Sequence, residues 1–186
     1  MAACACRNTG GHKMLEAIIL VVLPFCMAFA ALSDLFTMTI ANRVSLLLVA
    51  TFAIVAPLTG MDMTTYGMHF ATAGGVLVLT FALFAYGGFG GGDAKLLTAI
   101  ALWCGYSQTF TEYLIYAAVF GGWLTLGLVF YRGTIISEYA GARFGFLERL
   151  GRKEVGVPYG IALGAAALVV APSMPLVAWA IERAAI

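Results

Sequence analysis

Long apolar stretches recur along this chain and leave little choice of fold. The stretch from Met14 to Ser33 is long enough to cross a bilayer as a helix, which rises about 1.5 Å per residue. With 62% apolar and 10% charged residues and a mean hydropathy of +0.98, the composition is not that of a water-soluble domain. A helix satisfies its own backbone hydrogen bonds in lipid. The sequence therefore predicts an all-α, polytopic integral membrane protein.

Polar loops and glycine-rich breaks divide the chain into about six predicted transmembrane helices, at residues 14–33, 44–57, 66–85, 94–104, 112–131 and 158–181. Residues 1–13 form a polar leader that precedes a possible native start at Met14. Residues 14–186 are predicted to be a single six-helix domain. A signal-peptide cleavage site at 28–30 is the alternative for the first helix, but the apolar run exceeds the usual length of about 7–15 residues. The paired glycines Gly74-Gly75 and Gly121-Gly122 predict close packing between helices.

Basic residues are distributed unevenly between the predicted loops. If the loop after the first helix is cytoplasmic, that side holds seven of them and the other side three. The seven are Arg43, Lys95, Arg132, Arg143, Arg149, Arg152 and Lys153; the three are Arg7, Lys13 and Arg183. Because cytoplasmic loops carry the excess of basic residues, an external amino terminus is predicted.

The predicted cytoplasmic loop, 132–157, is the one long polar connection in the sequence. Its apolar residues recur at roughly helical spacing, which fits a helix along the membrane surface and a solvated loop equally well. They are Ile136, Tyr139, Phe144, Leu147 and Leu150.

Several functional classes are disfavoured by the composition. A net charge of +1 provides no basic field for nucleic acid. The four cysteines lack the C-x-x-C pairs of a zinc site, and the two histidines stand apart from other ligands. Cys26 and Cys104 are predicted to be buried hydrophobic residues, while Cys4 and Cys6 support a metal or disulfide only weakly. No metal site is indicated.

A glycine run ends in a carboxylate in the middle of the chain. Residues 87–92 are glycine at every position except Phe89, and Asp93 follows directly. Glycine lets the backbone adopt crowded conformations and lets another chain approach closely. Since an acidic residue at membrane depth is costly, Asp93 is a functional-site candidate that needs a partner. Asp34, at the end of the first predicted helix, is the best partner, because the topology brings both aspartates to one membrane face.

Two neighbouring carboxylates cannot both ionise cheaply, so such a pair keeps one proton near neutral pH. The charged group takes a proton from water, and the protonated group donates to the scissile carbonyl oxygen. This is amide hydrolysis without a metal or a covalent intermediate. A helix N-cap would explain Asp93 alone, but not the second aspartate. Lys95 does not face Asp93 on a helix and is predicted to mark the membrane boundary or to meet substrate.

These residues resemble the motifs of the type IV prepilin leader peptidases. The stretch 90–95 matches G-x-G-D-x-K, Asp34 followed by Ile40-Ala41-Asn42 resembles an aspartate preceding I-P-N, and 157–160 looks like the P-Y-G opening of the last helix. The resemblance covers most of the chain, from roughly 14 to 181. Ala41 stands where the family usually has proline. The short turn after Asp34 leaves no room for the zinc-binding domain of longer members, so the chain looks like the short branch associated with Flp/Tad pili.

The resemblance implies a GxGD aspartyl protease bundle that removes the basic leader of a type IV prepilin or pseudopilin at the cytoplasmic face of a bacterial inner membrane. It implies catalytic roles for Asp34 and Asp93 and no cofactor. Substrate-binding residues are predicted at Gly90, Gly92, Lys95 and Asn42. Two alternatives remain: a non-catalytic channel or assembly subunit of a pilus or secretion system, in which the glycines pack helices, and a presenilin-like protease that cuts within the membrane.

Overall fold

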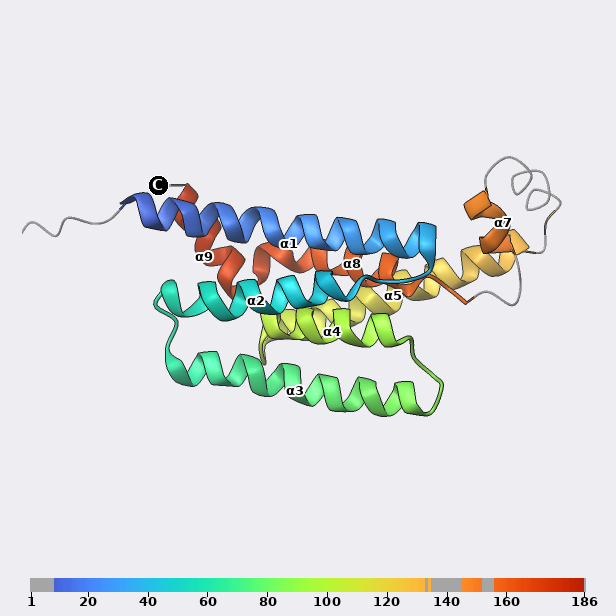
Figure 1. The fold of residues 1–186 in the computed structure, drawn as a ribbon, viewed down its shortest axis with the longest axis horizontal. Helices are drawn as coiled ribbons and strands as arrows, with labels where there is room; N and C mark the ends of the chain where they lie inside the picture. Colours follow the sequence, from blue (N-terminus) through green and yellow to red (C-terminus); the bar gives the residue numbers. More distant parts are fainter. Residues whose placement is uncertain (1–8, 133, 135–144, 152–155, 186) are drawn as a thin grey trace, which may run out of the picture.

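The computed structural model describes residues 9–132, 134, 145–151 and 156–185, and every regular element in this part is a helix (Figure 1). The helices are α1 (Thr9–Thr37), α2 (Asn42–Leu58), α3 (Met63–Ala85), α4 (Gly91–Cys104), α5 (Gln108–Arg132), α7 (Gly145–Gly151), α8 (Tyr159–Val170), the 3-10 turn η1 (Ala171–Ser173) and α9 (Pro175–Ala184). The predicted all-α class is confirmed. Helix α1 begins before Met14, and the domain boundary at that residue stays a prediction.

All six predicted apolar segments are helical, but they differ in length. Helices α1, α3 and α5 are long and apolar enough to cross a membrane, and α8 with α9 makes a fourth span if the pair is counted as one. This pair bends by 53°, whereas a single continuous helix was expected. The bend falls at Pro172 and Pro175, since proline has no amide hydrogen to continue the helical ladder. Helix α4 has only 14 residues and begins within the glycine run, at Gly91.

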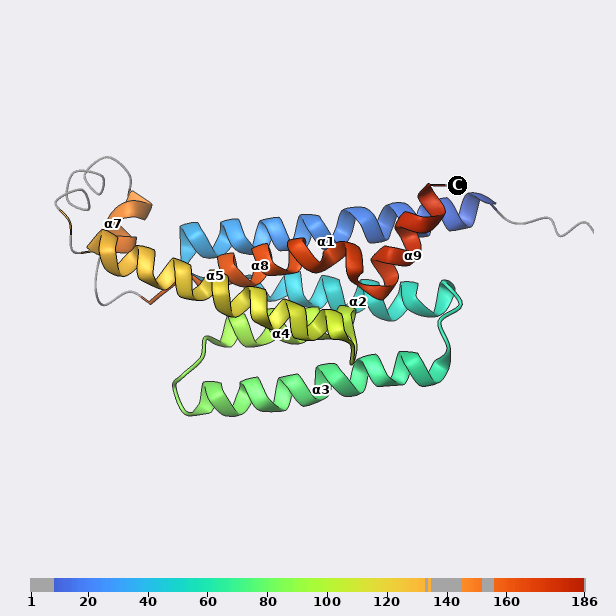
Figure 2. The ribbon, with the colours of Figure 1, turned by 180° about the vertical axis from the view of Figure 1, so that it is seen from behind.

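The longer helices run side by side along the long axis of the molecule, and the short helices α4 and α8 lie at its centre (Figures 1 and 2). Helix α8 packs against both α1 and α5, and α4 packs against α2, α3 and α8. The fully buried Trp103 of α4 donates from its indole Nε1 to the carbonyl oxygen of Leu48 in α2, at 3.1 Å. The central helices therefore join the two halves of the bundle.

The carboxyl end of α4 is closed by a histidine and a glycine. The buried His69 of α3 donates from Nδ1 to the carbonyl oxygen of Leu102 at 2.7 Å, and so satisfies one of the last carbonyls of α4. Gly105 follows in the left-handed region, with φ of 64°. A Cβ there would lie 2.6 Å from His69 Cε1. Both the backbone conformation and the imidazole ring therefore require glycine at this position.

The two glycine pairs behave differently from one another. A Cβ added to Gly74 or Gly75 would meet no atom within 4 Å, so the predicted packing point in α3 is wrong: these glycines lie on an exposed face. A Cβ on Gly121 would lie 2.7 Å from the Tyr159 ring, whereas Gly122 is open. Close packing is thus confirmed at Gly121 alone, where α5 receives the first residue of α8.

Part of the polar connection 132–157 is helical. Helix α7 packs against α5 and α1, with Leu150 buried and Leu147 half-buried. Arg132 donates from Nε to the carbonyl oxygen of Leu150 at 2.8 Å, which ties α7 to the end of α5. The other residues of the predicted amphipathic pattern, and Cys4 and Cys6, lie outside the described residues.

Candidate active site

The two predicted catalytic aspartates line one cavity. Asp34 lies in the last turn of α1 and Asp93 in the first turn of α4, at the end of the bundle where α1 stops and α4 starts (Figure 1, right). The cavity has a volume of about 330 Å³ and is also lined by residues 38–40, Asn42 and residues 90–92. The carboxyl groups of Asp34 and Asp93 interact electrostatically. Residues 59 positions apart in the sequence are thus brought together.

Asp34 is held by the start of a helix from the far end of the chain. Its side chain is only 5% exposed, and its Oδ2 accepts a hydrogen bond of 2.7 Å from the backbone N–H of Gly160. Gly160 belongs to the first turn of α8, where the backbone N–H groups lack partners within the helix and the helix dipole is positive. The amino end of α8 therefore orients the Asp34 carboxylate.

Gly160 is also a steric requirement of this contact. A Cβ at this position would lie 2.8 Å from Asp34 Oδ2 and 2.8 Å from Ile40 Cδ1. Such distances cannot be accommodated unless α8 or the aspartate moves. Gly160 is the functional residue that the sequence reasoning missed, because Pro158-Tyr159-Gly160 was noted there only as a family motif. The available signal was a glycine directly after a proline at the start of a predicted helix.

Asp93 has a more open setting than Asp34. It is half-buried, and the N-cap of α4 is Gly90, so the N-cap interpretation of Asp93 does not hold. Within the described part of the chain, no hydrogen-bond donor reaches its carboxylate. A Cβ on Gly90 would lie 2.6 Å from Asp93 Oδ2. The carboxylate thus folds back over Gly90 at the edge of the cavity.

The turn between α1 and α2 forms one wall of the cavity and is held by hydroxyl groups. Ser33 donates from Oγ to the carbonyl oxygen of Thr39 at 2.8 Å, and Thr37 donates from Oγ1 to the carbonyl oxygen of Ser33 at 2.7 Å. Met38 takes a left-handed conformation with φ of 55°. These bonds seat Ile40 against the start of α4, where a Cβ on Gly92 would lie 3.3 Å from Ile40 Cβ.

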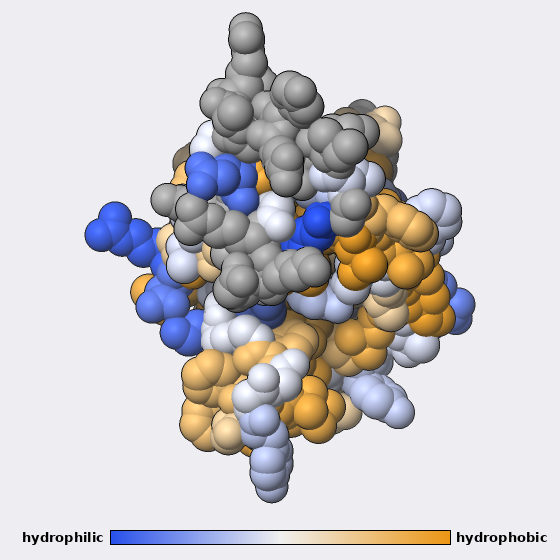
Figure 3. All heavy atoms as spheres, turned by 90° about the vertical axis from the view of Figure 1, so that its right-hand side faces the viewer, coloured by the Kyte–Doolittle hydropathy of each residue, from blue (hydrophilic) through white to orange (hydrophobic). Residues whose placement is uncertain are grey.

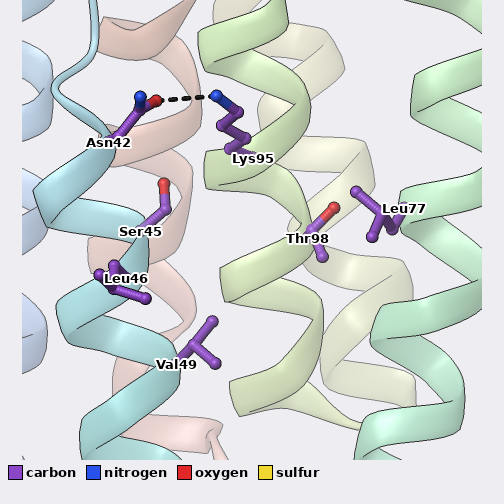
Figure 4. Close-up of a pocket in the computed structure, with 7 residues that line it drawn as sticks. All are labelled: Asn42, Ser45, Leu46, Val49, Leu77, Lys95 and Thr98. Atoms are coloured by element: carbon purple, nitrogen blue, oxygen red, sulfur yellow. Dashed lines mark hydrogen bonds between the residues drawn. The ribbon is translucent and has the colours of Figure 1, made fainter.

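The four predicted substrate-binding residues divide between two neighbouring hollows. Gly90, Gly92 and Asn42 line the cavity of the two aspartates, and Lys95 does not. Lys95 instead donates from Nζ to Asn42 Oδ1 at 2.8 Å, across the gap between α4 and α2 (Figure 4). It lines an adjoining groove of about 410 Å³, and Asn42 lines both hollows.

Comparison with known protein families identifies the chain. A family model described as the type IV leader peptidase family matches residues 21–130, which is more than half of the sequence. The chain belongs to this family. Comparisons with curated proteins and with solved structures gave no match.

Membership in the leader peptidase family makes this chain a multi-pass membrane protease. The matched range contains both aspartates and the whole glycine run, and it ends before Gly160. Among the described residues, no three histidine, cysteine, aspartate or glutamate side chains are grouped so that they could hold a metal ion. Cys26 and Cys104 are buried free thiols. Among the described residues that line the cavity, Asp34 and Asp93 are the two that carry a carboxyl group.

Proposed function

We propose that this protein is an aspartic endopeptidase that removes the short basic leader from type IV prepilins or pseudopilins of the Flp/Tad kind. The observation that carries the proposal is the single cavity lined by Asp34 and Asp93 in a member of the leader peptidase family. Two carboxyl groups facing one hollow can supply both the general base and the general acid for amide hydrolysis without a metal.

In the proposed reaction the pair holds one proton. The ionised carboxylate accepts a proton from a water molecule while the water oxygen bonds to the scissile carbonyl carbon. The other carboxyl group donates its proton to the carbonyl oxygen. Collapse of the tetrahedral intermediate breaks the carbon–nitrogen bond. The departing amine takes a proton from the protonated carboxyl group, and the ionised carboxylate takes a proton from a hydroxyl of the intermediate, so the pair again holds one proton. The shared proton belongs to the pair rather than to one residue. The Gly160 N–H fixes the orientation of Asp34 for these transfers.

The substrate in this proposal has a basic leader in the cytoplasm, a glycine before the cut and an apolar helix in the lipid. The uneven distribution of basic residues supports a cytoplasmic position for the cavity, in a bacterial inner membrane. Gly90 and Gly92 line the cavity beside Asp93, and Asn42 offers an amide to an extended backbone there. Hydrolysis requires such an extended segment, because the carbonyl of a helical peptide is bonded within the helix.

The test is cleavage of a co-expressed Flp-type prepilin by Asp34→Asn and Asp93→Asn variants. Each change removes one half of the acid–base pair, so we expect leader removal to slow by at least about 10²–10⁴-fold with membrane insertion unchanged. Asp62→Asn is the matched control, since Asp62 is an exposed N-cap of α3 and asparagine caps equally well. Full processing by either dyad variant would refute the proposal, and a channel or assembly subunit would show no processing even in the wild type.

A further inference from the structure

A groove lies beside the aspartate cavity and is not used by the proposed chemistry. It is formed by one face each of α2, α3 and α4, and its walls are apolar: Leu46 and Val49 come from α2 and Leu77 from α3 (Figure 4). Leu46 is 69% exposed and Leu77 is 45% exposed. In a membrane protein such side chains face lipid, so the groove opens sideways into the hydrocarbon layer.

One end of this groove presents hydrogen-bond donors. Lys95 uses one ammonium proton on Asn42 Oδ1, and no acceptor among the described residues takes its other protons or those of the Asn42 amide. Ser45, only 7% exposed, has a hydroxyl group without any partner in the described structure. Figure 4 shows this hydroxyl pointing toward the end where Asn42 and Lys95 meet. A buried hydroxyl without a partner is costly to the fold, so these donors indicate a ligand that brings acceptors.

The groove and the aspartate cavity meet at Asn42. This residue lines both hollows, and Ser45 follows it one turn later on the same face of α2. A chain that leaves the cavity past Asn42 would therefore enter the groove at its donor end and continue along the apolar walls. The order along the path is the acidic pair, then donors, then apolar surface.

We propose that the groove holds the substrate on the lipid side of the scissile bond, with its backbone unwound next to the cut. Unwinding a helix at membrane depth leaves main-chain carbonyls without hydrogen bonds, which hydrocarbon does not tolerate. The donors of Lys95, Asn42 and Ser45 satisfy those carbonyls, and the apolar walls receive the side chains that follow. A bilayer lipid would also find an apolar surface here, but only a peptide cut at the aspartates has to pass Asn42. This inference rests on the proposed function.

The first test is disulfide cross-linking in proteoliposomes. The probe is a synthetic peptide with a basic leader, a glycine and an apolar helix, carrying one cysteine either in the leader or within two turns beyond the cut. The protein carries Asp93→Asn to prevent cleavage, serine at Cys4 and Cys6, and one new cysteine, Thr98→Cys or Leu77→Cys. The matched control is Leu47→Cys, a half-exposed residue of α2 that lines the opposite hollow, between α1 and α2.

We expect peptides with the cysteine beyond the cut to cross-link to Thr98→Cys and Leu77→Cys, and leader cysteines and Leu47→Cys to stay unlinked. Cross-links only to Leu47→Cys, or none from the groove, would overturn the inference. So would a phospholipid that protects Thr98→Cys from thiol reagents and is not displaced by the peptide. If the wild-type protein fails to cut the same peptide, the proposed function fails instead, whatever cross-links form.

The second test uses Ser45→Ala. If its hydroxyl binds an unwound carbonyl, the change lowers kcat/KM for the peptide by about tenfold, the effect of one lost hydrogen bond, while thermal stability is unchanged or higher. The matched control is Ser107→Ala, just beyond the carboxyl end of α4, which removes a hydroxyl that donates to the carbonyl oxygen of Cys104. We expect this variant to leave kcat/KM unchanged. Unchanged kcat/KM in Ser45→Ala would contradict the assignment of this residue.

Discussion

Each aspartate of the site lies against a glycine. Asp34 faces Gly160 and Asp93 faces Gly90, and a Cβ on either glycine would come within 3 Å of a carboxylate oxygen. Gly160 lies in α8 and Gly90 is the N-cap of α4, so the positions of the carboxylates depend on how α8 and the start of α4 are placed. At the scale of single residues, the site is shaped as much by absent side chains as by the acids themselves.

Gly160→Ala should inactivate the enzyme without unfolding it. The added methyl group displaces Asp34 or the amino end of α8, and the hydrogen bond of 2.7 Å is lost. Because small misplacements of catalytic groups have large effects, we expect leader cleavage per inserted molecule to fall by about 10²-fold. Gel analysis of prepilin processing, normalised to protein in the membrane, measures this.

The control for this variant is Gly156→Ala. Gly156 is exposed, and a Cβ there meets no atom within 4 Å. Wild-type cleavage by Gly160→Ala would contradict the role of the α8 amide, and equal losses in both variants would point to a general effect on the loop before α8.

The sequence was sufficient to single out both aspartates, because an acid in an apolar chain is conspicuous. The partner of Asp34 was not predictable in the same way, since the hydrogen bond joins residues 126 positions apart through a backbone group that carries no side-chain signature. Gly74-Gly75 shows the opposite error: a glycine pair in an apolar helix resembles a packing motif, yet here it lies on an exposed face.

At the scale of elements, α4 is the helix on which the site depends. Asp93 lies in its first turn, and its last turn is closed by His69 and Gly105. Near that end, the indole of Trp103 donates a hydrogen bond to α2. A short helix has few turns to hold it in register, so both ends need fixed contacts. The carboxyl end of α4 thus supports the aspartate at the amino end.

Gly105→Ala should destabilise the protein more than Gly60→Ala. Both glycines have positive φ, 64° and 84°, a conformation that costs another residue about 1–2 kcal/mol. Only at Gly105 does the new Cβ also strike the His69 ring, which adds about 1–3 kcal/mol of overpacking. Thermal unfolding in detergent should show the larger loss for Gly105→Ala. Equal losses would mean that the ring moves aside freely.

The helices were predictable as elements because runs of apolar residues define them. The breaks between helices were less predictable. The apolar pattern continues through Pro172 and Pro175 into α9, and the bend arises because proline has no backbone N–H to continue the helix. The stretch 91–93 looked like loop because of its glycines, but it forms the first turn of α4. Packing against Ile40 offsets the low helix propensity of glycine there.

At the scale of the whole molecule, the end that carries the aspartates has a polar face. Figure 3 looks at this end and shows hydrophilic residues on its face, beside hydrophobic residues along the rim. Lys95, Arg43 and Arg132 all lie at this end, on α4, α2 and α5. Such a distribution fits a molecule whose sides face lipid and whose active end faces water.

Thiol labelling of intact cells and of inverted vesicles should establish the orientation. A cysteine in place of Thr39, in the turn after α1, should react only from the cytoplasmic side, because the basic residues gather there. A cysteine in place of Tyr106, which is 85% exposed between α4 and α5, should react only from the outside. The reverse pattern would put the aspartates on the wrong side for a cytoplasmic leader.

The bond between Gly160 and Asp34 also has a consequence for biosynthesis. The first helix enters the membrane while most of the chain is still unmade, and the N–H that orients its aspartate is added 126 residues later. Until then the Asp34 carboxylate lacks the hydrogen bond that orients it. The hydrogen bond that orients this carboxylate is therefore one of the last contacts that the growing chain can complete, and it forms only once α8 has taken its place beside α1.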